Sequence, residues 1–490
     1  MTNANLIHAM KSFYSLLLVV FILGCGDQTS DSLIVIHEVA IIDAVQGFKS
    51  DQSVVIRNEE IIEVVNASEV MIPNGAEVID GKGKFLIPGL WDAHVHLSYI
   101  PELSSSMFDL FLVNGITSIR DTGGQLDLVM PWKEKSVANP GSSPRVMVAG
   151  PLLDGVPTVY DGSPGRPKLG LGAATPEEAK LLVDQFVEAG VDLIKSYEML
   201  TPQSYQAVIE HAKRYDLPVT GHVPLSMDVI EASDLGLRSM EHLRNLEMAC
   251  SSDFDSLKKV REKLLIEGNS LQGGVLRSNI HEAQRYHAVF TQDAQRRDLV
   301  LTTLLKNNTW QVPTLTIAAA RQNRVFDREE WRDDFRYLPP SVRDQWTESA
   351  INFSEIATPE KSIAYANWAY EMIGHLDDKR IGIMAGTDTP IFFLTPGFSL
   401  HEELRLLVKG GLSPLKALEA ATIRPAEYFN LQEKLGTIEA GKLADLVLLN
   451  ANPLKEITNT QKITAVIKNG MFYSRNSLDS MLENLENPTP

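Results

Sequence analysis

Six side chains that could bind metal ions each come at the end of an apolar run. His94 and His96 stand one residue apart in the stretch Gly-Leu-Trp-Asp-Ala-His-Val-His-Leu at 89–97. Alternate residues of a strand point to the same side, so both imidazoles could hold one metal ion. Taken singly, any such residue could instead be an ordinary buried polar group. The others follow later apolar runs: Lys195, His222, His242 and Asp388.

The elements around these residues alternate between short apolar strands and helical stretches. This pattern predicts repeated strand-helix units with a parallel sheet, and eight units predict an α/β fold with a closed (β/α)8 TIM-like barrel. In such a barrel the C-terminal strand ends surround the active site, which would gather the six residues into one cluster. We expect strands at Leu90 to His96, Ile116 to Asp121, Arg145 to Gly150, Leu193 to Tyr197, Pro218 to His222, Ser239 to His242, Trp310 to Leu315 and Ile381 to Asp388.

The domain organisation follows from where this pattern starts and stops. The barrel is expected over 88–435, with helices after Thr175 and Thr201, which each precede a Pro. Residues 32–87 and 436–475 carry short strands with turns, including Leu33 to Ile36, Ala40 to Asp43 and Gly436 to Ile438, and predict a small composite β-sandwich. Two long connections, 243–309 and 316–380, predict helical insertions that either cover the site or only flank it. The tail at 476–490 is polar and is expected to fray.

Composition narrows the class of protein. The chain has 490 residues, 44% hydrophobic and 22% charged, which is ordinary for globular domains. Its net charge of -18 argues against a nucleic-acid partner, because polyphosphate binding needs clustered Lys and Arg. Two cysteines imply no disulfide framework.

The N-terminus predicts a targeting signal over residues 1–25. The apolar run from Leu16 to Leu23 is short for a membrane span, and it leads into Ile-Leu-Gly-Cys at 22–25. This arrangement resembles a bacterial lipoprotein signal with a lipid on Cys25, and an uncleaved anchor is the alternative. We therefore expect a lipid-anchored protein of the bacterial cell envelope, periplasmic or at the cell surface.

Several motifs together resemble the amidohydrolase superfamily of metal-dependent hydrolases. They are the His-Val-His stretch, Asp-Leu-Ile-Lys at 192–195, Gly-His-Val at 221–223, Glu-His at 241–242, Ala-Gly-Thr-Asp-Thr at 385–389 and Gly-Thr-Ile-Glu-Ala-Gly-Lys-Leu-Ala-Asp at 436–445. The resemblance covers about residues 33 to 475. It is strongest to members related to imidazolonepropionase and to Xaa-Pro or Xaa-Arg dipeptidases.

The resemblance implies a binuclear metal centre. His94, His96 and Asp388 would bind one divalent ion, His222 and His242 a second, and a CO2-derived carbamate on Lys195 would bridge them. Two close dications need a shared anion, which a protonated amine could not supply. The alternative is that Lys195 reaches solvent and the site holds one metal. Imidazole, carboxylate and carbamate ligands suit Zn, and also Mn, Fe or Co.

The implied activity is hydrolysis of a carbon-nitrogen bond by a metal-bound hydroxide, with Asp388 as general base and then general acid. Dipeptides or N-acyl amino acids are the expected substrates. Tyr197 would bind the substrate or simply pack, Arg244 is a weaker candidate for a carboxylate clamp, and Arg120 and Asp121 are interpreted as structural contacts. The alternatives are a ring-opening hydrolase of cyclic amides and a metal-free scaffold without catalysis.

Overall fold

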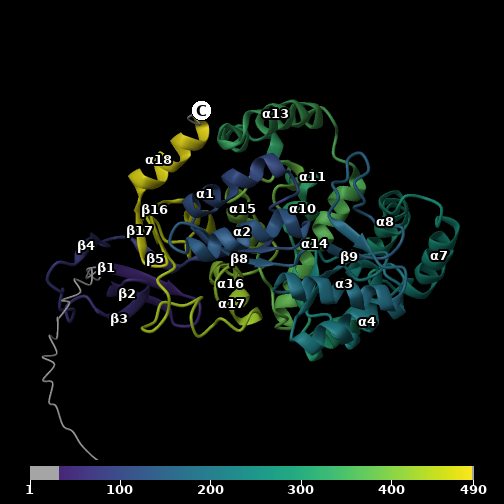
Figure 1. Ribbon diagram of the computed structural model, residues 1–490, viewed down its shortest axis with the longest axis horizontal. Helices are drawn as coiled ribbons and strands as arrows, with labels where there is room; N and C mark the ends of the chain where they lie inside the picture. The colour runs from purple at the N-terminus through teal and green to yellow at the C-terminus, as the bar shows by residue number, and fades with distance from the viewer. Residues whose placement is uncertain (1–31, 488–490) are drawn as a thin grey trace, which may run out of the picture.

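The computed structural model describes residues 32–487, so the predicted lipoprotein signal and Cys25 lie outside the described residues. Within this range the chain is an α/β protein with one mixed sheet and two parallel sheets (Figure 1). Among the helices of residues 32–487, none is long and apolar enough to cross a membrane.

An eight-stranded sheet is built from both ends of the chain. Its order is β17-β16-β15-β5-β1-β2-β3, and β4 pairs with β1 outside this path. Purple and yellow strands therefore lie side by side at the left of Figure 1. The two predicted sets of strands thus join in one sheet, and the sandwich itself stays a prediction. The strands are β1 (Leu33–Asp43), β2 (Gly47–Arg57), β3 (Glu60–Asn66), β4 (Glu77–Asp80), β5 (Phe85–Pro88), β15 (Leu446–Leu449), β16 (Ile463–Lys468) and β17 (Met471–Ser474).

This composite sheet is held by an apolar face and by long-range pairing. Ile34, Ile36 and Val54 pack in one cluster with Leu446 of β15, as alternation along the strands requires. The two short strands expected at Leu33 to Ile36 and Ala40 to Asp43 form a single strand β1, whose pairing with β2 is irregular after Ile36. β5 pairs in parallel with β1 and antiparallel with β15, so it joins the two chain ends.

Two parallel sheets follow β5 in the chain. The order of the first is β6-β7-β8 and that of the second is β10-β9-β11-β12-β13-β14. Every pair in both sheets is parallel, which the alternation of strands and helices predicted. The strands are β6 (Leu90–Val95), β7 (Ile116–Asp121), β8 (Arg145–Val148), β9 (Leu152–Asp154), β10 (Gly170–Gly172), β11 (Ile194–Ser196), β12 (Val219–Gly221), β13 (Ser239–Glu241) and β14 (Trp310–Val312).

The prediction of a regular strand at Ile381 to Asp388 is wrong. The segment and the Thr389 that follows it make only isolated parallel bridges, from Ile383 to Gln311 of β14 and from Thr389 to Val95 of β6. Gly386 lies so close to β6 that a Cβ there would be 2.7 Å from the Cβ of His94. Asp388 then adopts a left-handed φ of 68°. Close approach and this turn interrupt a regular ladder.

The strand expected at Gly436 to Ile438 is also absent. The segment forms a bend without ladder pairing. The Ile438 backbone N–H instead donates to the buried carboxylate of Asp43 at 2.7 Å. A side chain thus takes the place of a partner strand.

The helices include those predicted after Thr175 and Thr201. Both threonines accept a hydrogen bond from a first-turn N–H, and Pro follows each. Helices also occupy most of the long connections at 243–309 and 316–380. The helices are α1 (Ser104–Val113), α2 (Leu126–Ala138), α3 (Pro176–Ala189), α4 (Pro202–Ala212), α5 (Val229–Leu235), α6 (Leu246–Ala249), α7 (Phe254–Glu267), α8 (Gly273–Phe290), α9 (Ala294–Lys306), α10 (Leu315–Ala318), α11 (Ala320–Asn323), α12 (Glu329–Asp333), α13 (Pro340–Ser354), α14 (Glu360–Asp378), α15 (Phe398–Lys409), α16 (Pro414–Ala420), α17 (Ile423–Tyr428) and α18 (Arg475–Glu486).

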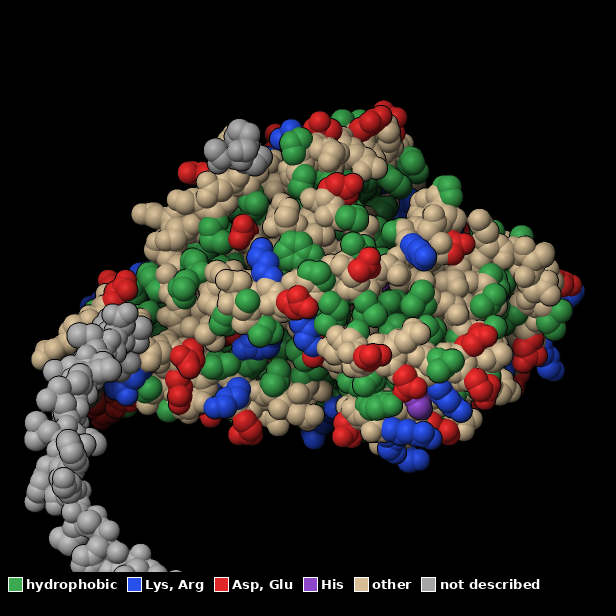
Figure 2. All heavy atoms as spheres, in the orientation of Figure 1, with side chains coloured by type: hydrophobic (Ala, Val, Ile, Leu, Met, Phe, Trp, Pro, Cys, Tyr) green, Lys and Arg blue, Asp and Glu red, His purple; other side chains and the backbone are tan. Residues whose placement is uncertain are grey.

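The surface carries charges of both signs. On the face drawn in Figure 2, acidic and basic side chains are interspersed, and no broad area of that face is basic.

The C-terminal tail expected to fray is instead a docked helix. The Ser474 hydroxyl accepts from the Ser477 N–H, which caps the start of α18. Leu478 is fully buried, and α18 packs against α1. The helix is polar except on one apolar face, and this face packs against the rest of the protein. The polar composition of the tail gave no indication of this contact.

Because Leu478 is the buried anchor of α18, we expect Leu478→Ala to lower the free energy of unfolding by about 2–4 kcal/mol. Chemical denaturation of this variant and of Glu483→Ala, an exposed position on the same helix, measures the difference. A Leu478→Ala protein as stable as the control would mean that the helix contributes no packing.

Candidate metal centre

The six predicted residues come from the ends of parallel strands and from the segment that bridges β14 and β6. His94 lies on β6 and Lys195 on β11, whereas His222 and His242 directly follow β12 and β13. The N–H of Asp388 donates to the backbone carbonyl of His94 at 2.7 Å, so this carboxylate is placed against β6.

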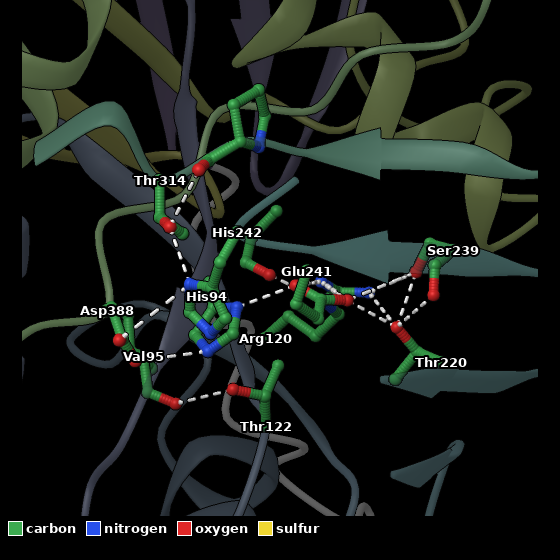
Figure 3. Close-up of polar contacts among 12 residues, drawn as sticks. His94, Val95, Arg120, Thr122, Thr220, Ser239, Glu241, His242, Thr314 and Asp388 are labelled. Atoms are coloured by element: carbon green, nitrogen blue, oxygen red, sulfur yellow. Dashed lines mark hydrogen bonds and ion pairs between the residues drawn. The ribbon is translucent and has the colours of Figure 1, made fainter. Parts of the chain in front are cut away.

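Asp388 is the centre of the cluster. One of its oxygens, Oδ1, lies 3.1 Å from the Nε2 atoms of both His94 and His96, and Oδ2 lies 3.9 Å from Nδ1 of His242. One ligand atom each from His94, His242 and Asp388 lies within 4.8 Å of the others, a separation that a single cation could span. Figure 3 shows these three side chains converging. Burial works to raise the pKa of Asp388, but His242 and His94 hold it well below its ordinary value.

The four histidines are held by their Nδ1 atoms. In a metal site, such a contact fixes the ring and directs the other nitrogen to the ion. The Nδ1 partners are Glu241 for His94 at 2.6 Å, the Gly123 carbonyl for His96 at 2.9 Å, Glu198 for His222 at 2.6 Å and the Thr314 hydroxyl for His242 at 2.6 Å.

Three buried atoms in this cluster have no hydrogen-bond partner among the described residues: Nε2 of His94, Nζ of Lys195 and Oδ1 of Asp388. Buried polar atoms without partners are costly, so a ligand that satisfies all three fits the arrangement. The donor set of imidazoles and a carboxylate is the kind that binds a divalent transition metal.

Lys195 is 1% exposed, which excludes the alternative of a side chain that reaches solvent. Burial is the main reason that its pKa is lowered to about 8. A buried, easily deprotonated amine can react with CO2, because the carbamate forms only from the neutral amine. Whether Lys195 carries that group stays a prediction.

Glu241 is a residue that sequence reasoning did not assign to the site. It is fully buried at the end of β13, where it contacts His94 and accepts two hydrogen bonds of 2.9 Å from Arg120 (Figure 3). Burial raises the pKa of Glu241, but Arg120, Lys195 and His94 together keep it well below the ordinary value. Arg120 is thus a structural contact, as interpreted, and its carboxylate partner orients a candidate ligand.

Glu198 plays the same part for His222. It follows β11, is fully buried, and lies 2.6 Å from His281 and 3.0 Å from Arg277 as well. Arg244 lies 3.4 Å from the same carboxylate. The only sequence signal was its position three residues after Lys195 at a strand end.

Two further carboxylates hold the loops that carry the site. Asp92 accepts from the N–H and hydroxyl of Thr387, at 3.0 and 2.7 Å, and thereby positions the turn before Asp388. Glu403 on α15 accepts from the N–H groups of Leu315 and Thr316, next to the Thr314 that contacts His242.

Tyr197 lines the small cavity at the cluster, which has a volume of about 40 Å³. Its ring stacks on His222 with centroids 4.4 Å apart and contacts the ring of Tyr160. It therefore packs beside the candidate ligands and also borders the space in front of them. His401 lies outside this cluster, where its Nδ1 is 2.9 Å from the hydroxyl of Thr460.

Comparison with known proteins finds similar proteins over most of the chain. The chain is 23% identical over 457 residues to an adenine deaminase from Desulforamulus reducens, an alignment that covers 92% of this chain but only 59% of that protein. Among solved structures, a Xaa-Pro dipeptidase with bound methionine gives a TM-score of 0.65 at 20% identity, covering 90% of this chain and 100% of the other. A bottromycin amidohydrolase gives a TM-score of 0.67 at 23% identity, covering 93% and 89%.

A family model supplies the assignment. The model described as the amidohydrolase family matches residues 85–472, which contain all six predicted site residues and both helical insertions. The chain belongs to the amidohydrolase family.

Proposed function

We propose that this protein is a metal-dependent hydrolase that cleaves carbon-nitrogen bonds in amides, with dipeptides or N-acyl amino acids as substrates. Membership of the amidohydrolase family and the similarity to a Xaa-Pro dipeptidase structure support the bond type. The observation that carries the proposal is a group of three buried atoms that make no hydrogen bond among the described residues, on His94, Lys195 and Asp388, surrounded by histidines whose Nδ1 atoms are fixed.

The proposed architecture is a closed eight-unit barrel that carries this site. Its support is a chain of contacts that joins the two parallel sheets. The N–H of Asp192, two residues before β11, donates to the carbonyl of Val148 at the end of β8. The bridges at Ile383 and Thr389 join β14 to β6. Closure of this kind would bring every strand end that carries a site residue to one face.

Two ions would occupy the proposed site, with Zn as the leading candidate and Mn, Fe or Co as alternatives. His94, His96 and Asp388 would hold one and His222 and His242 the other, with a carbamate on Lys195 between them. Bound divalent ions would polarise the substrate carbonyl and acidify water at neutral pH.

The side chains of this chain perform the remaining steps. The Asp388 carboxylate, whose low pKa keeps it ionised, accepts the proton of the attacking water and returns it to the leaving nitrogen. Glu241 and Glu198 keep the imidazoles of His94 and His222 in position throughout. Tyr197 closes one side of the cavity and limits the access of bulk water.

We also propose that the protein is anchored in a bacterial envelope through a lipid on Cys25. The support is the Ile-Leu-Gly-Cys sequence after an apolar run.

Asp388→Asn should lower kcat at least about a hundredfold, because an amide cannot accept the proton. The measurement is amino-acid release from dipeptides, N-acyl amino acids and cyclic amides by zinc- or manganese-loaded protein. Asp216→Asn makes the same change at an exposed residue with φ of 55°, which Asn tolerates, and should retain full activity. An Asp388→Asn enzyme within tenfold of wild type would exclude the proton-transfer role. Turnover of cyclic amides alone would favour the ring-opening alternative.

Lys195→Ala should reduce the bound metal from two ions to one for each chain, because the bridging anion is removed. Elemental analysis after loading with metal and bicarbonate gives the stoichiometry. Lys82→Ala, at a side chain that is 78% exposed, is the matched control and should keep two ions. Two ions in Lys195→Ala would contradict the carbamate, and a wild-type protein without metal would favour the scaffold alternative.

Cys25→Ser should abolish incorporation of labelled fatty acid and release the protein from the membrane fraction of a bacterial host, because the thiol is the acceptor of the lipid. Cys250→Ser, at a buried thiol, is the control and should remain membrane-bound. Unchanged labelling of Cys25→Ser would disprove the anchor.

A further inference from the structure

A larger pocket adjoins the candidate metal centre. Its volume is about 400 Å³, within the range of small-molecule sites, whereas the cavity at the cluster has about 40 Å³. The two cavities share His242, Arg244 and Arg277 in their walls. A substrate whose amide lies at the cluster would therefore extend into this pocket.

Both helical insertions build the pocket. From the first, α8 contributes Arg277, His281 and Arg285, which are four residues apart and so share one helix face. From the second, α14 contributes Lys361, and Arg321 comes from α11. α8 packs against α14, so the insertions meet at the pocket.

The pocket has more positive than negative side chains. Five cations line it, and three carboxylates contact them: Glu198 contacts Arg244 and Arg277, Glu247 lies 3.2 Å from Arg285, and Glu282 pairs with Lys361. Arg321 lies over the rings of Phe353 and Phe392, and no carboxylate of residues 32–487 is within ion-pair distance of it. The excess is two positive charges, in a chain with a net charge of -18.

Several of these cations are fixed before any ligand binds. The Arg285 guanidinium lies 4.6 Å from the ring centroid of Tyr365, and Arg321 lies 5.3 Å from that of Phe353. The Nε of Arg244 is buried and has no partner among the described residues. Guanidinium groups held in this way are suited to bind carboxylates with two hydrogen bonds.

We infer, on the basis of the proposed function, that this pocket selects amides whose amino-acid part carries a side-chain carboxylate in addition to its α-carboxylate. Two carboxylates match the excess of two positive charges. The preferred substrates are therefore dipeptides or N-acyl amino acids that end in Glu or Asp. The insertions act as the specificity element of the enzyme.

The direct test compares substrates of equal shape that differ in one charge. We expect kcat/KM for glycyl-glutamate to exceed that for glycyl-glutamine at least about tenfold, and likewise for N-acetyl-glutamate over N-acetyl-glutamine, because charge-assisted hydrogen bonds are lost with the amide. The preference should decrease between 20 and 500 mM NaCl, since salt screens the attraction.

Two variants remove pocket cations without leaving a buried carboxylate unpaired. Arg321 pairs with no carboxylate of residues 32–487, so Arg321→Gln leaves none without a partner. Lys361 pairs with Glu282, whose side chain is 65% exposed and therefore remains solvated in Lys361→Gln. Arg321→Gln and Lys361→Gln should each lower the Glu-over-Gln preference about threefold or more, mainly through KM. Lys263→Gln, at a 72% exposed side chain on α7, should leave the preference unchanged.

Binding of glutarate, compared with butyrate, separates this inference from the proposed function. Calorimetry on the metal-loaded protein should show tighter binding of glutarate and a weaker glutarate affinity in both variants. Hydrolysis without a preference for Glu, together with equal binding of the two acids, would overturn the inference and leave the proposed function intact. Selective glutarate binding without turnover of any amide would support the pocket and contradict the proposed function. If the protein hydrolyses no amide and binds glutarate and butyrate equally, both the inference and the proposed function are overturned.

Discussion

The site depends on how its buried imidazoles are fixed from behind. A histidine ring that is free to rotate cannot keep one nitrogen directed at a cation, and burial makes every unpaired nitrogen costly. Here Glu241 and Glu198 hold His94 and His222, and each carboxylate is itself compensated by an arginine, Arg120 or Arg277. Each of these two histidines is therefore the first member of a continuous series of polar contacts: histidine, carboxylate and arginine. Removal of Glu241 would leave Arg120 fully buried without its carboxylate partner.

The sequence predicted most of what depends on short spacing. The strand at Ile116 to Asp121 was predicted with its observed bounds, because it lies between Gly115 and the Gly123-Gly124 pair. The cluster around Asp388 was predicted because each member directly ends such a run. Helix α18 was missed although Leu478, Met481, Leu482 and Leu485 have the i, i+3, i+4, i+7 spacing of one helix face, because the polar residues between them were interpreted as a frayed tail.

What the sequence could not reveal is set by contacts between distant residues. Glu198 meets His222 24 residues later and His281 83 residues later, and His94 meets Glu241 across 147 residues. None of these spacings repeats a helix or strand period, so no local signal exists. The same holds for the segment at 381–389, where the approach of Gly386 to His94 prevents the ladder that its apolar residues favoured.

The composite sheet has a consequence for the order of folding. β5 lies between β1 and β15, and it runs directly into β6, which carries the first histidine. Phe85 of β5 pairs with Leu449, 364 residues later in the chain, so one edge of β5 has no partner until almost the whole chain has been synthesised. Such non-local pairing slows folding and leaves an exposed strand edge during translation. The strand that leads into the first histidine thus gains its second neighbour only after residues 446–449 have left the ribosome.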